Sequence, residues 1–149
     1  MLGLMQNWPL TVDKILDHAR SWHGDREVVT RSVEGPIVRT TYAQIHSRAK
    51  QVSNLLLGLG VTLGDRVATL AWNGYRHFEL YFGITGSGRV VHTINPRLLP
   101  EQIAWIANHA EDQVLCFDMT FLPLVQAVAA RLTTVKHFVA MTSREHMPG

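Results

Sequence analysis

Apolar segments alternate with helix-like segments from residue 64 to residue 142, and this alternation constrains the fold more than any other feature. Strand-like segments are expected at 66–72, 90–94, 113–117 and 135–141, and helices between them at 74–86, 100–109 and 121–132. Strands that run as continuous apolar stretches are typical of parallel sheets with both faces covered. The short connections favour right-handed crossovers. The sequence therefore predicts an α/β fold with a doubly wound, mostly parallel sheet and flanking helices.

A helix, a hairpin and a second helix are expected before this unit, within residues 11–60. Thr11 can cap a helix to about Trp22, in which five apolar residues share one face: Val12, Ile15, Leu16, Ala19 and Trp22. Segments 27–33 and 36–40 surround Glu34-Gly35, a hairpin signal. The second helix follows Thr41 and is expected to end near Gly58 and Gly60.

Composition excludes several classes of protein. The 149 residues are 46% hydrophobic and 17% charged, which is typical of one globular domain. The net charge is only +2 and the arginines are scattered, so a nucleic-acid partner is not expected. Apolar runs are far shorter than the ~20 residues of a membrane span, and the first residues lack the basic and apolar parts of a signal peptide. We therefore expect a cytoplasmic protein with at most peripheral membrane association.

Cys116 is the only cysteine, which rules out an internal disulfide and fits a reducing compartment. It lies in the apolar run Val114-Leu115-Cys116-Phe117, so a buried, inert thiol is expected. The eight histidines have no spacing typical of metal ligands, and neither paired carboxylates nor a Ser-His-Asp set is evident. The sequence thus predicts no catalytic residue and no metal ligand within this chain.

Polar residues follow the four expected strands, at the edge where open α/β sheets bind ligands. They are Trp72, Asn73, Asn95, Arg97, Asp118, Thr120, Thr142 and Ser143. Capping and turn formation would select the same residue types. Arg97 stands out because it follows a strand end and Pro96 stiffens the turn, so its guanidinium could hold a phosphate by a bidentate contact.

A glycine-rich segment resembles a phosphate-binding loop and contains Gly83, Gly86 and Gly88. It follows an expected helix and precedes an expected strand, whereas a dinucleotide-binding fingerprint follows a strand and begins a helix. The three glycines are interpreted as a helix terminus and a place of close helix–sheet packing. A Walker-type motif is not found in the sequence.

Several segments together resemble the N-terminal region of the AMP-forming acyl-CoA synthetases, most closely their medium- and long-chain fatty-acid branch. These are Arg39-Thr40-Thr41-Tyr42, Leu59-Gly60-Val61, Gly64-Asp65-Arg66-Val67-Ala68, Trp72-Asn73, Thr93-Ile94-Asn95-Pro96-Arg97-Leu98, Pro100-Glu101-Gln102-Ile103 and Asn108-His109-Ala110-Glu111-Asp112. The resemblance implies that residues 1–149 are the N-terminal part of the large adenylate-forming domain. It covers nearly the whole chain in order.

The resemblance also implies an activity of the longer protein. ATP and a fatty acid or other carboxylic acid give an acyl-adenylate and pyrophosphate, and CoA then displaces AMP. ATP, Mg²⁺ and CoA are the cofactors implied. The family's phosphate loop ending in Pro-Lys-Gly, its adenine motifs and its C-terminal lysine do not occur here, so this chain alone is expected to be inactive. Arg97 matches a position that contacts the nucleotide end of CoA in some relatives, and a homodimer is implied because some relatives dimerise.

Two alternatives remain open at this stage. A self-contained α/β binding or regulatory module, such as a receiver-like domain, would need clustered acids after the first strand. The chain has Ala71-Trp72-Asn73 there, and Asp118 lacks acidic neighbours in the sequence. A relative acting on an aryl, sulfur-containing or luciferase-like acid is the other alternative. If a partner domain is missing, an exposed apolar face should favour self-association.

Overall fold

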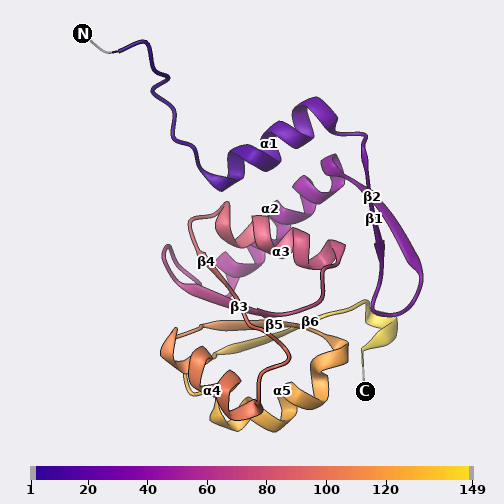
Figure 1. The fold of residues 1–149 in the computed structure, drawn as a ribbon, viewed down its shortest axis with the longest axis vertical. Coiled ribbons are helices and arrows are strands. Elements are labelled where there is room, and N and C mark those ends of the chain that lie inside the picture. The colour runs from indigo at the N-terminus through magenta and orange to yellow at the C-terminus, as the bar shows by residue number, and fades with distance from the viewer. Residues whose placement is uncertain (1–2, 148–149) are drawn as a thin grey trace.

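Four parallel strands form the central sheet of the computed structural model, which describes residues 3–147 (Figure 1). They are β3 (Arg66–Leu70), β4 (Val90–Thr93), β5 (Val114–Asp118) and β6 (His137–Met141). Their order across the sheet is β4-β3-β5-β6, and every neighbouring pair is parallel. The chain therefore changes direction across the sheet after β4, which confirms the predicted parallel topology.

Helices cover both faces of this sheet, as a doubly wound fold requires. α2 (Tyr42–Gly58) and α3 (Tyr75–Thr85) lie on one face, and α4 (Pro100–His109) and α5 (Leu122–Val128) lie on the other (Figure 1). α5 is shorter than the predicted helix, because single 3₁₀ turns at Met119–Phe121 and Ala129–Arg131 occupy its flanks. A further 3₁₀ turn, Arg144–His146, follows β6.

The expected helix, hairpin and helix precede the sheet. α1 (Val12–His23) is followed by β1 (Glu27–Arg31) and β2 (Ile37–Thr41), which pair antiparallel with each other. α2 begins where the sequence predicts because Thr41 and Gln44 form a capping box. The Gln44 backbone N–H donates to Thr41 Oγ1 at 3.3 Å, and the Thr41 backbone N–H donates to Gln44 Oε1 at 2.9 Å.

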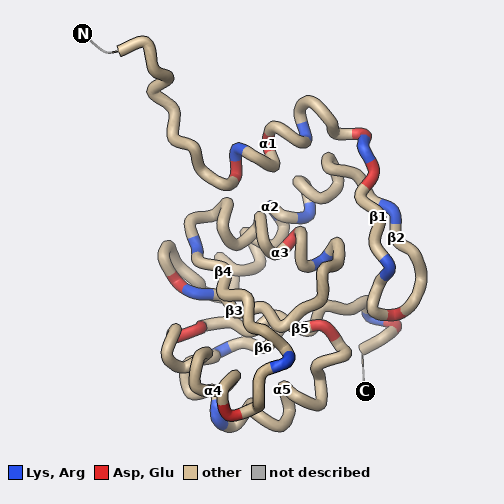
Figure 2. The backbone as a smooth tube through the Cα atoms, in the orientation of Figure 1, with Lys and Arg blue, Asp and Glu red and all other residues tan. Residues whose placement is uncertain are grey.

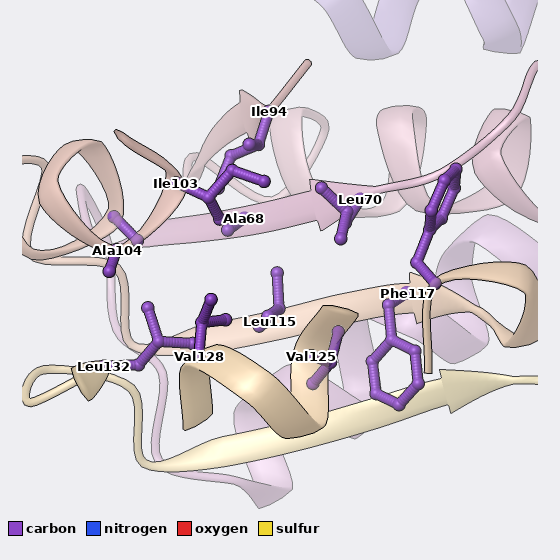
Figure 3. Close-up of a cluster of buried hydrophobic side chains, with 12 residues drawn as sticks. Ala68, Leu70, Ile94, Ile103, Ala104, Leu115, Phe117, Val125, Val128 and Leu132 are labelled. Carbon is purple, nitrogen blue, oxygen red and sulfur yellow. The ribbon is translucent and has the colours of Figure 1, made fainter. Parts of the chain in front are cut away.

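Buried side chains fill both spaces between sheet and helices. The cluster beneath α4 and α5 includes Ala68, Leu70, Leu115 and Phe117 from the central strands (Figure 3). Alternate residues of the same strands, such as Val67 and Cys116, pack toward α2 and α3. β3 and β5 are buried almost throughout, but β4 and β6 form the edges of the sheet and are partly exposed. The expectation that all four strands are covered on both faces is therefore wrong for the edge strands.

The apolar face predicted for α1 is largely exposed in the structure. Leu16 alone is buried, whereas 64% of Ile15 and 75% of Trp22 is accessible to solvent. The helix rests on α2 through Leu16, which packs with Ile45 and Ala49, and through Asp17, whose Oδ1 lies 2.9 Å from His46 Nε2. An apolar stripe predicts that one side of a helix is buried, but in residues 3–147 most of this side of α1 is left exposed.

Gly83 allows close packing, but between two helices and not between helix and sheet as predicted. A Cβ placed there would meet the Ala49 carbonyl oxygen and Val52 Cβ at 2.6 Å, so α3 can approach α2 this closely only without a side chain. Gly88 adopts a positive φ of 75°, which glycine tolerates, after the helix has ended. The interpretation of these glycines as a helix terminus is confirmed.

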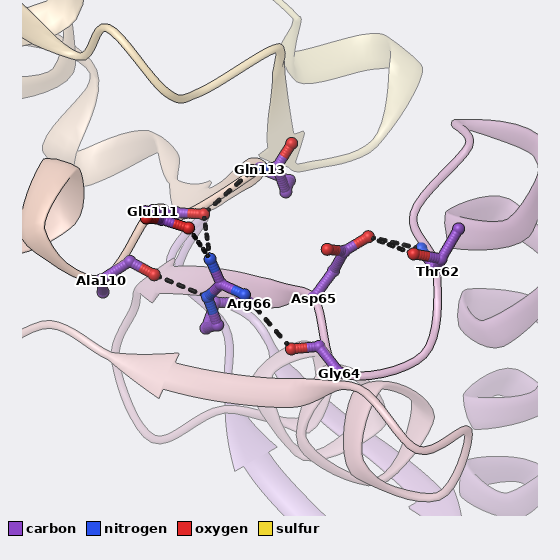
Figure 4. Close-up of polar contacts among 7 residues, drawn as sticks. All are labelled: Thr62, Gly64, Asp65, Arg66, Ala110, Glu111 and Gln113. Atoms are coloured by element: carbon purple, nitrogen blue, oxygen red, sulfur yellow. Dashed lines mark hydrogen bonds and ion pairs between the residues drawn. The ribbon is translucent and has the colours of Figure 1, made fainter.

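The Gly64-Asp65-Arg66 motif closes the amino ends of the strands (Figure 4). Arg66 Nε donates to the Ala110 carbonyl oxygen at 2.6 Å, and its Nη2 contacts Glu111 Oε2 at 2.7 Å. These bonds satisfy a backbone carbonyl at the end of α4 and fix the position of Glu111, whose φ is positive at 55°. The motif is therefore structural, and ligand-binding residues are to be sought at the opposite end of the sheet.

Candidate functional site

A cavity of about 690 Å³ lies at the carboxyl ends of β3 and β4. The part of its wall that α3 contributes is rich in aromatic side chains, which are Tyr75, Phe78, Tyr81 and Phe82. Asn73 and Asn95, which the sequence places after two different strands, both line it. The parallel sheet thus brings these two predicted rim residues together, as expected for strand ends at one edge.

His77 and Thr69 form a hydrogen-bonded pair in the lining of this cavity. His77 Nε2 lies 3.0 Å from the hydroxyl of Thr69, a residue whose side chain is almost fully buried. Burial lowers the pKa of His77, and this outweighs the opposing effects of a hydrogen bond with the Trp72 backbone and the Asp118 charge. The imidazole is therefore favoured in its neutral form at this edge of the sheet.

Asp118 and Trp72 connect the carboxyl ends of β5 and β3, which are neighbouring strands of the sheet. The Trp72 backbone N–H donates to Asp118 Oδ2 at 2.7 Å, and the Trp72 ring lies 5.0 Å from that of Phe121. Burial raises the pKa of Asp118, and this effect is opposed by the Trp72 hydrogen bond, by any protonated fraction of His77 and by the Arg76 guanidinium. Asp118 thus serves as an internal acceptor that ties neighbouring strand ends together.

A third group of contacts joins the hairpin to the end of β6. Arg76 Nη1 lies 2.7 Å from Glu34 Oε1 and donates to the Met141 carbonyl oxygen at 3.2 Å. The Thr142 hydroxyl donates to the same Glu34 oxygen at 3.2 Å. The sequence analysis missed Glu34 and Arg76, because nothing local shows that a turn residue will meet a helix 42 positions later.

Arg97 lies on the loop between β4 and α4 and does not line the cavity, although Asn95 and Pro96 directly before it do. It is exposed, and its backbone N–H donates to Asn95 Oδ1 at 3.0 Å. Its guanidinium makes no hydrogen bond or ion pair with another residue of the described range 3–147. A guanidinium at a strand end could hold a phosphate by a bidentate contact, and that role of Arg97 stays a prediction.

The remaining predicted residues have simpler surroundings. Cys116 is buried as expected, and burial raises the pKa of its thiol to about 12, which disfavours the reactive thiolate. Ser143 contacts His146 Nδ1 at 2.7 Å, and Thr120 is exposed. Within residues 3–147 no three His, Cys, Asp or Glu side chains are grouped to hold a metal ion, and no helix there is long and apolar enough to cross a membrane.

Comparison with known protein families identifies the family to which this chain belongs. The family model described as AMP-binding enzyme matches residues 16–147. The chain belongs to this family. It is 49% identical over 97% of its length to a 3-methylmercaptopropionyl-CoA ligase of Ruegeria lacuscaerulensis, and 49% identical over 94% to a long-chain-fatty-acid–CoA ligase of Thermus thermophilus. A medium-chain-fatty-acid–CoA ligase of Ectopseudomonas oleovorans is 42% identical over 100% of the chain.

This AMP-binding family member spans about a quarter of those relatives, covering 27%, 26% and 28% of their respective lengths. Solved structures agree with the fold. A fatty acyl CoA synthetase of Mycobacterium tuberculosis has a TM-score of 0.77 at 25% identity, with 87% of this chain and 26% of that one covered. For the anthranilate CoA ligase AuaEII the TM-score is 0.78 at 26% identity, with 92% and 27% covered. The predicted α/β class and the predicted family are both confirmed.

Proposed function

We propose that this chain is the N-terminal part of an acyl-CoA ligase that activates a medium- or long-chain carboxylic acid. The longer protein would form an acyl-adenylate from ATP with Mg²⁺ and then transfer the acyl group to CoA. The observation that carries the ligase activity is the 49% identity to two acyl-CoA ligases over 97% and 94% of the chain. The medium or long chain of the acid is proposed from the resemblance of the sequence segments to the fatty-acid branch. Residues 1–149 alone are proposed to be inactive, because they span only about a quarter of the length of the acyl-CoA ligases that they match.

Adenylation gives the carboxylate a leaving group, and the charge on the phosphates must be stabilised by cations or donors. Arg97 is the residue of this chain that we propose to contact a phosphate of CoA. Its exposure and unengaged guanidinium support this, as does its place on a loop at the carboxyl edge of the sheet. It would bind and orient CoA, with the chemical steps left to other parts of the protein.

A second candidate substrate is a short sulfur-containing acid. The relative named 3-methylmercaptopropionyl-CoA ligase is as similar to this chain, at 49% identity, as the long-chain-fatty-acid–CoA ligase. Identity in this part of the chain therefore favours neither acid. The ratio of kcat/KM for a fatty acid to kcat/KM for 3-(methylthio)propionate, measured with the parent enzyme, distinguishes the two candidate substrates.

Carboxylate-dependent exchange between ATP and pyrophosphate tests the activity directly. We expect exchange by the parent polypeptide with octanoate or palmitate, and none by residues 1–149 under the same conditions. Higher kcat/KM with 3-(methylthio)propionate would select the second candidate acid, and with benzoate an aryl acid. Exchange catalysed by residues 1–149, or none by the parent with any acid, would overturn the proposal.

Replacing Arg97 should weaken CoA binding and leave adenylation unchanged. Because hydrogen bonds to charged groups contribute about 1.5–3 kcal/mol, we expect Arg97→Ala to raise the KM for CoA by about ten- to a hundredfold in the parent enzyme. Arg97→Lys should have an intermediate effect, since it keeps the charge but loses the bidentate geometry. The exposed Arg131, in the 3₁₀ turn that follows α5, provides the control variant, Arg131→Ala. An unchanged KM for CoA, or a loss of pyrophosphate exchange, would contradict this role.

The assembly and location are further parts of the proposal. We propose a homodimer, supported by large apolar side chains left exposed on α1. A cytoplasmic location is supported by the single buried cysteine. Sizing of the purified protein and fractionation of cells test these two points separately.

A further inference from the structure

A hollow of about 370 Å³ lies along the exposed side of α4. Five residues line it and define what we call the α4 hollow: Leu98, Glu101, Gln102, Trp105 and Ile106. Leu98 and Ile106 are half-buried and pack against the core cluster beneath the sheet. Glu101, Gln102 and Trp105 are exposed. The α4 hollow therefore has an apolar floor and open walls of mixed polarity.

Trp105 is held in a stacked pair at the wall of the α4 hollow. Its ring centre lies 4.8 Å from that of His109, one turn later on the helix, and the two planes are inclined by only 11°. His109 thus covers one face of the indole, while 64% of Trp105 stays accessible to solvent. An exposed aromatic ring that is held in place in this way is a surface on which a planar base can stack.

A pair with the same spacing on α1 shows that this stacking is not general. His18 and Trp22 are also four positions apart on a helix, and 75% of Trp22 is exposed. Their ring centres lie 6.3 Å apart and their planes are inclined by 33°, so the two rings do not stack. The arrangement of Trp105 and His109 is therefore specific to α4.

Two polar side chains of the α4 hollow complement the edge of an adenine base. The Gln102 amide oxygen accepts from the Leu99 backbone N–H at 3.0 Å, so its N–H₂ group remains to donate to a ligand. The Glu101 carboxylate is an acceptor. Adenine presents an amino donor beside the N7 acceptor, and these two groups match one acceptor and one donor on the protein.

Positive charge lies at the opposite end of the α4 hollow from the stacked pair. Arg97 directly precedes Leu98 of the floor, with about 3.8 Å between their Cα atoms. α4 begins at Pro100, so the positive end of its dipole lies on the same side. Trp105 follows about 7.5 Å further along the helix axis. Figure 2 shows basic and acidic positions close together around α4, as a ligand with both phosphates and a donor-bearing base requires.

We propose that the α4 hollow binds the adenine of CoA, with the base stacked on Trp105 and the phosphates beside Arg97. This inference rests on the ligase activity proposed above. It deepens that proposal by assigning the residues that hold the base, in addition to the phosphate contact proposed for Arg97. Trp105 is the stacking residue, and His109 positions its ring.

The chemistry of the two adenine nucleotides favours CoA over ATP as the occupant. CoA reacts through a thiol at the far end of its long pantetheine arm, so its nucleotide can remain on the protein surface. ATP reacts at a phosphate close to its nucleoside, so its base must lie near the catalytic groups. Within residues 3–147 no three His, Cys, Asp or Glu side chains are grouped to hold a metal ion such as the Mg²⁺ of ATP. A shallow surface hollow therefore suits the nucleotide of CoA.

Steady-state kinetics of the parent enzyme with CoA and with pantetheine test the assignment. Pantetheine carries the thiol and its arm without the nucleotide. We expect Trp105→Ala to raise the KM for CoA by about five- to a hundredfold, because the stacking of a base on one aromatic side chain is lost. The kcat with CoA and the kcat/KM with pantetheine should stay unchanged. Trp105→Phe should keep most of the affinity for CoA, since it keeps a ring.

Binding of adenosine 3′,5′-bisphosphate, which has the base, ribose and 3′-phosphate of CoA without its arm, gives a second measurement that needs no turnover. Calorimetry with the parent enzyme should show that Trp105→Ala raises the Kd by a similar factor. His109→Ala should raise it less, because the indole loses only its support. Trp22→Ala is the matched control, since Trp22 is an exposed tryptophan beside a histidine but does not line the α4 hollow. Circular dichroism of each variant verifies that the fold is kept.

Three results would overturn the assignment. An unchanged KM for CoA in folded Trp105→Ala would leave the α4 hollow to a protein partner. An equal loss with CoA and with pantetheine would give Trp105 a packing role. A raised KM for ATP with loss of pyrophosphate exchange would assign the hollow to ATP. Because this exchange needs no CoA, its absence in the wild-type parent with every acid overturns the ligase activity. Normal exchange with no effect of Trp105→Ala on CoA overturns the adenine site alone.

Discussion

Glu34 ties the hairpin to the carboxyl edge of the sheet, and its ionisation decides whether this tie holds. Burial alone would raise its pKa, but its backbone hydrogen bond and the Arg76 guanidinium lower it from 4.5 to about 2. Because the pKa is lower in the folded state, the ionised group stabilises the fold fully above pH 4.5. This contribution is lost as the pH falls through about 2.

Glu34→Gln should therefore flatten the acid side of the stability profile. We expect a loss of about 1–3 kcal/mol at neutral pH, since Arg76 is left half-buried without its partner, and a smaller loss of stability between pH 4.5 and about 2 than in the wild type. Urea unfolding at a series of pH values measures both. Glu101→Gln, at an exposed position of α4, is the control. Parallel profiles for the wild type and Glu34→Gln would contradict the assignment.

Residues could be predicted where local sequence decides their surroundings. Cys116 lies in an apolar strand, so its burial followed from its neighbours. Asp118 was placed correctly at a strand end, but its bond to the Trp72 N–H depends on β5 lying beside β3, which only the strand order reveals. The contact between Glu34 and Thr142, 108 positions apart, had no local signal at all.

At the scale of elements, the contact between α2 and α3 depends on one missing side chain. Gly83→Ala would place a Cβ 2.6 Å from the Ala49 carbonyl oxygen and from Val52 Cβ, and backbone cannot yield as a side-chain tip can. We expect a loss of about 1–3 kcal/mol in the free energy of unfolding, as for other overpacked cores. Gly58→Ala, at the end of α2 with nothing within 4 Å, should be neutral or slightly stabilising. Equal effects of the two substitutions on urea midpoints would exclude this explanation.

The existence and order of the elements were predictable because their apolar periods are strong, and α4 was placed at its observed bounds. The surfaces that the elements bury were less predictable. The stripe on α1 has the pattern of a buried face, yet Ile15 and Trp22 are exposed. Periodicity predicts that one face of a helix is apolar. Which element or which other chain covers that face depends on the tertiary or quaternary structure.

At the scale of the whole molecule, stability should be unevenly distributed. β5 is buried at every position and pairs with strands on both sides. β1 and β2 pair only with each other, and α1 contributes Leu16 alone to the core. Local opening is easiest where few apolar contacts hold an element. The sheet and the α1–hairpin region are therefore expected to open separately.

Hydrogen exchange measured by mass spectrometry distinguishes these regions. Amides of β3 and β5 should exchange slowest, and those of α1 and the hairpin fastest, because opening the sheet requires disrupting both layers of its core. If α1 forms the dimer contact, its protection should rise with protein concentration, since binding stabilises the closed form by mass action. Trp22→Glu should remove that rise and leave β5 unchanged. Uniform exchange would instead indicate that α1, the hairpin and the sheet open as one cooperative unit. In that case the small cluster around Ile45 would couple α1 to the sheet, and separate opening would be excluded.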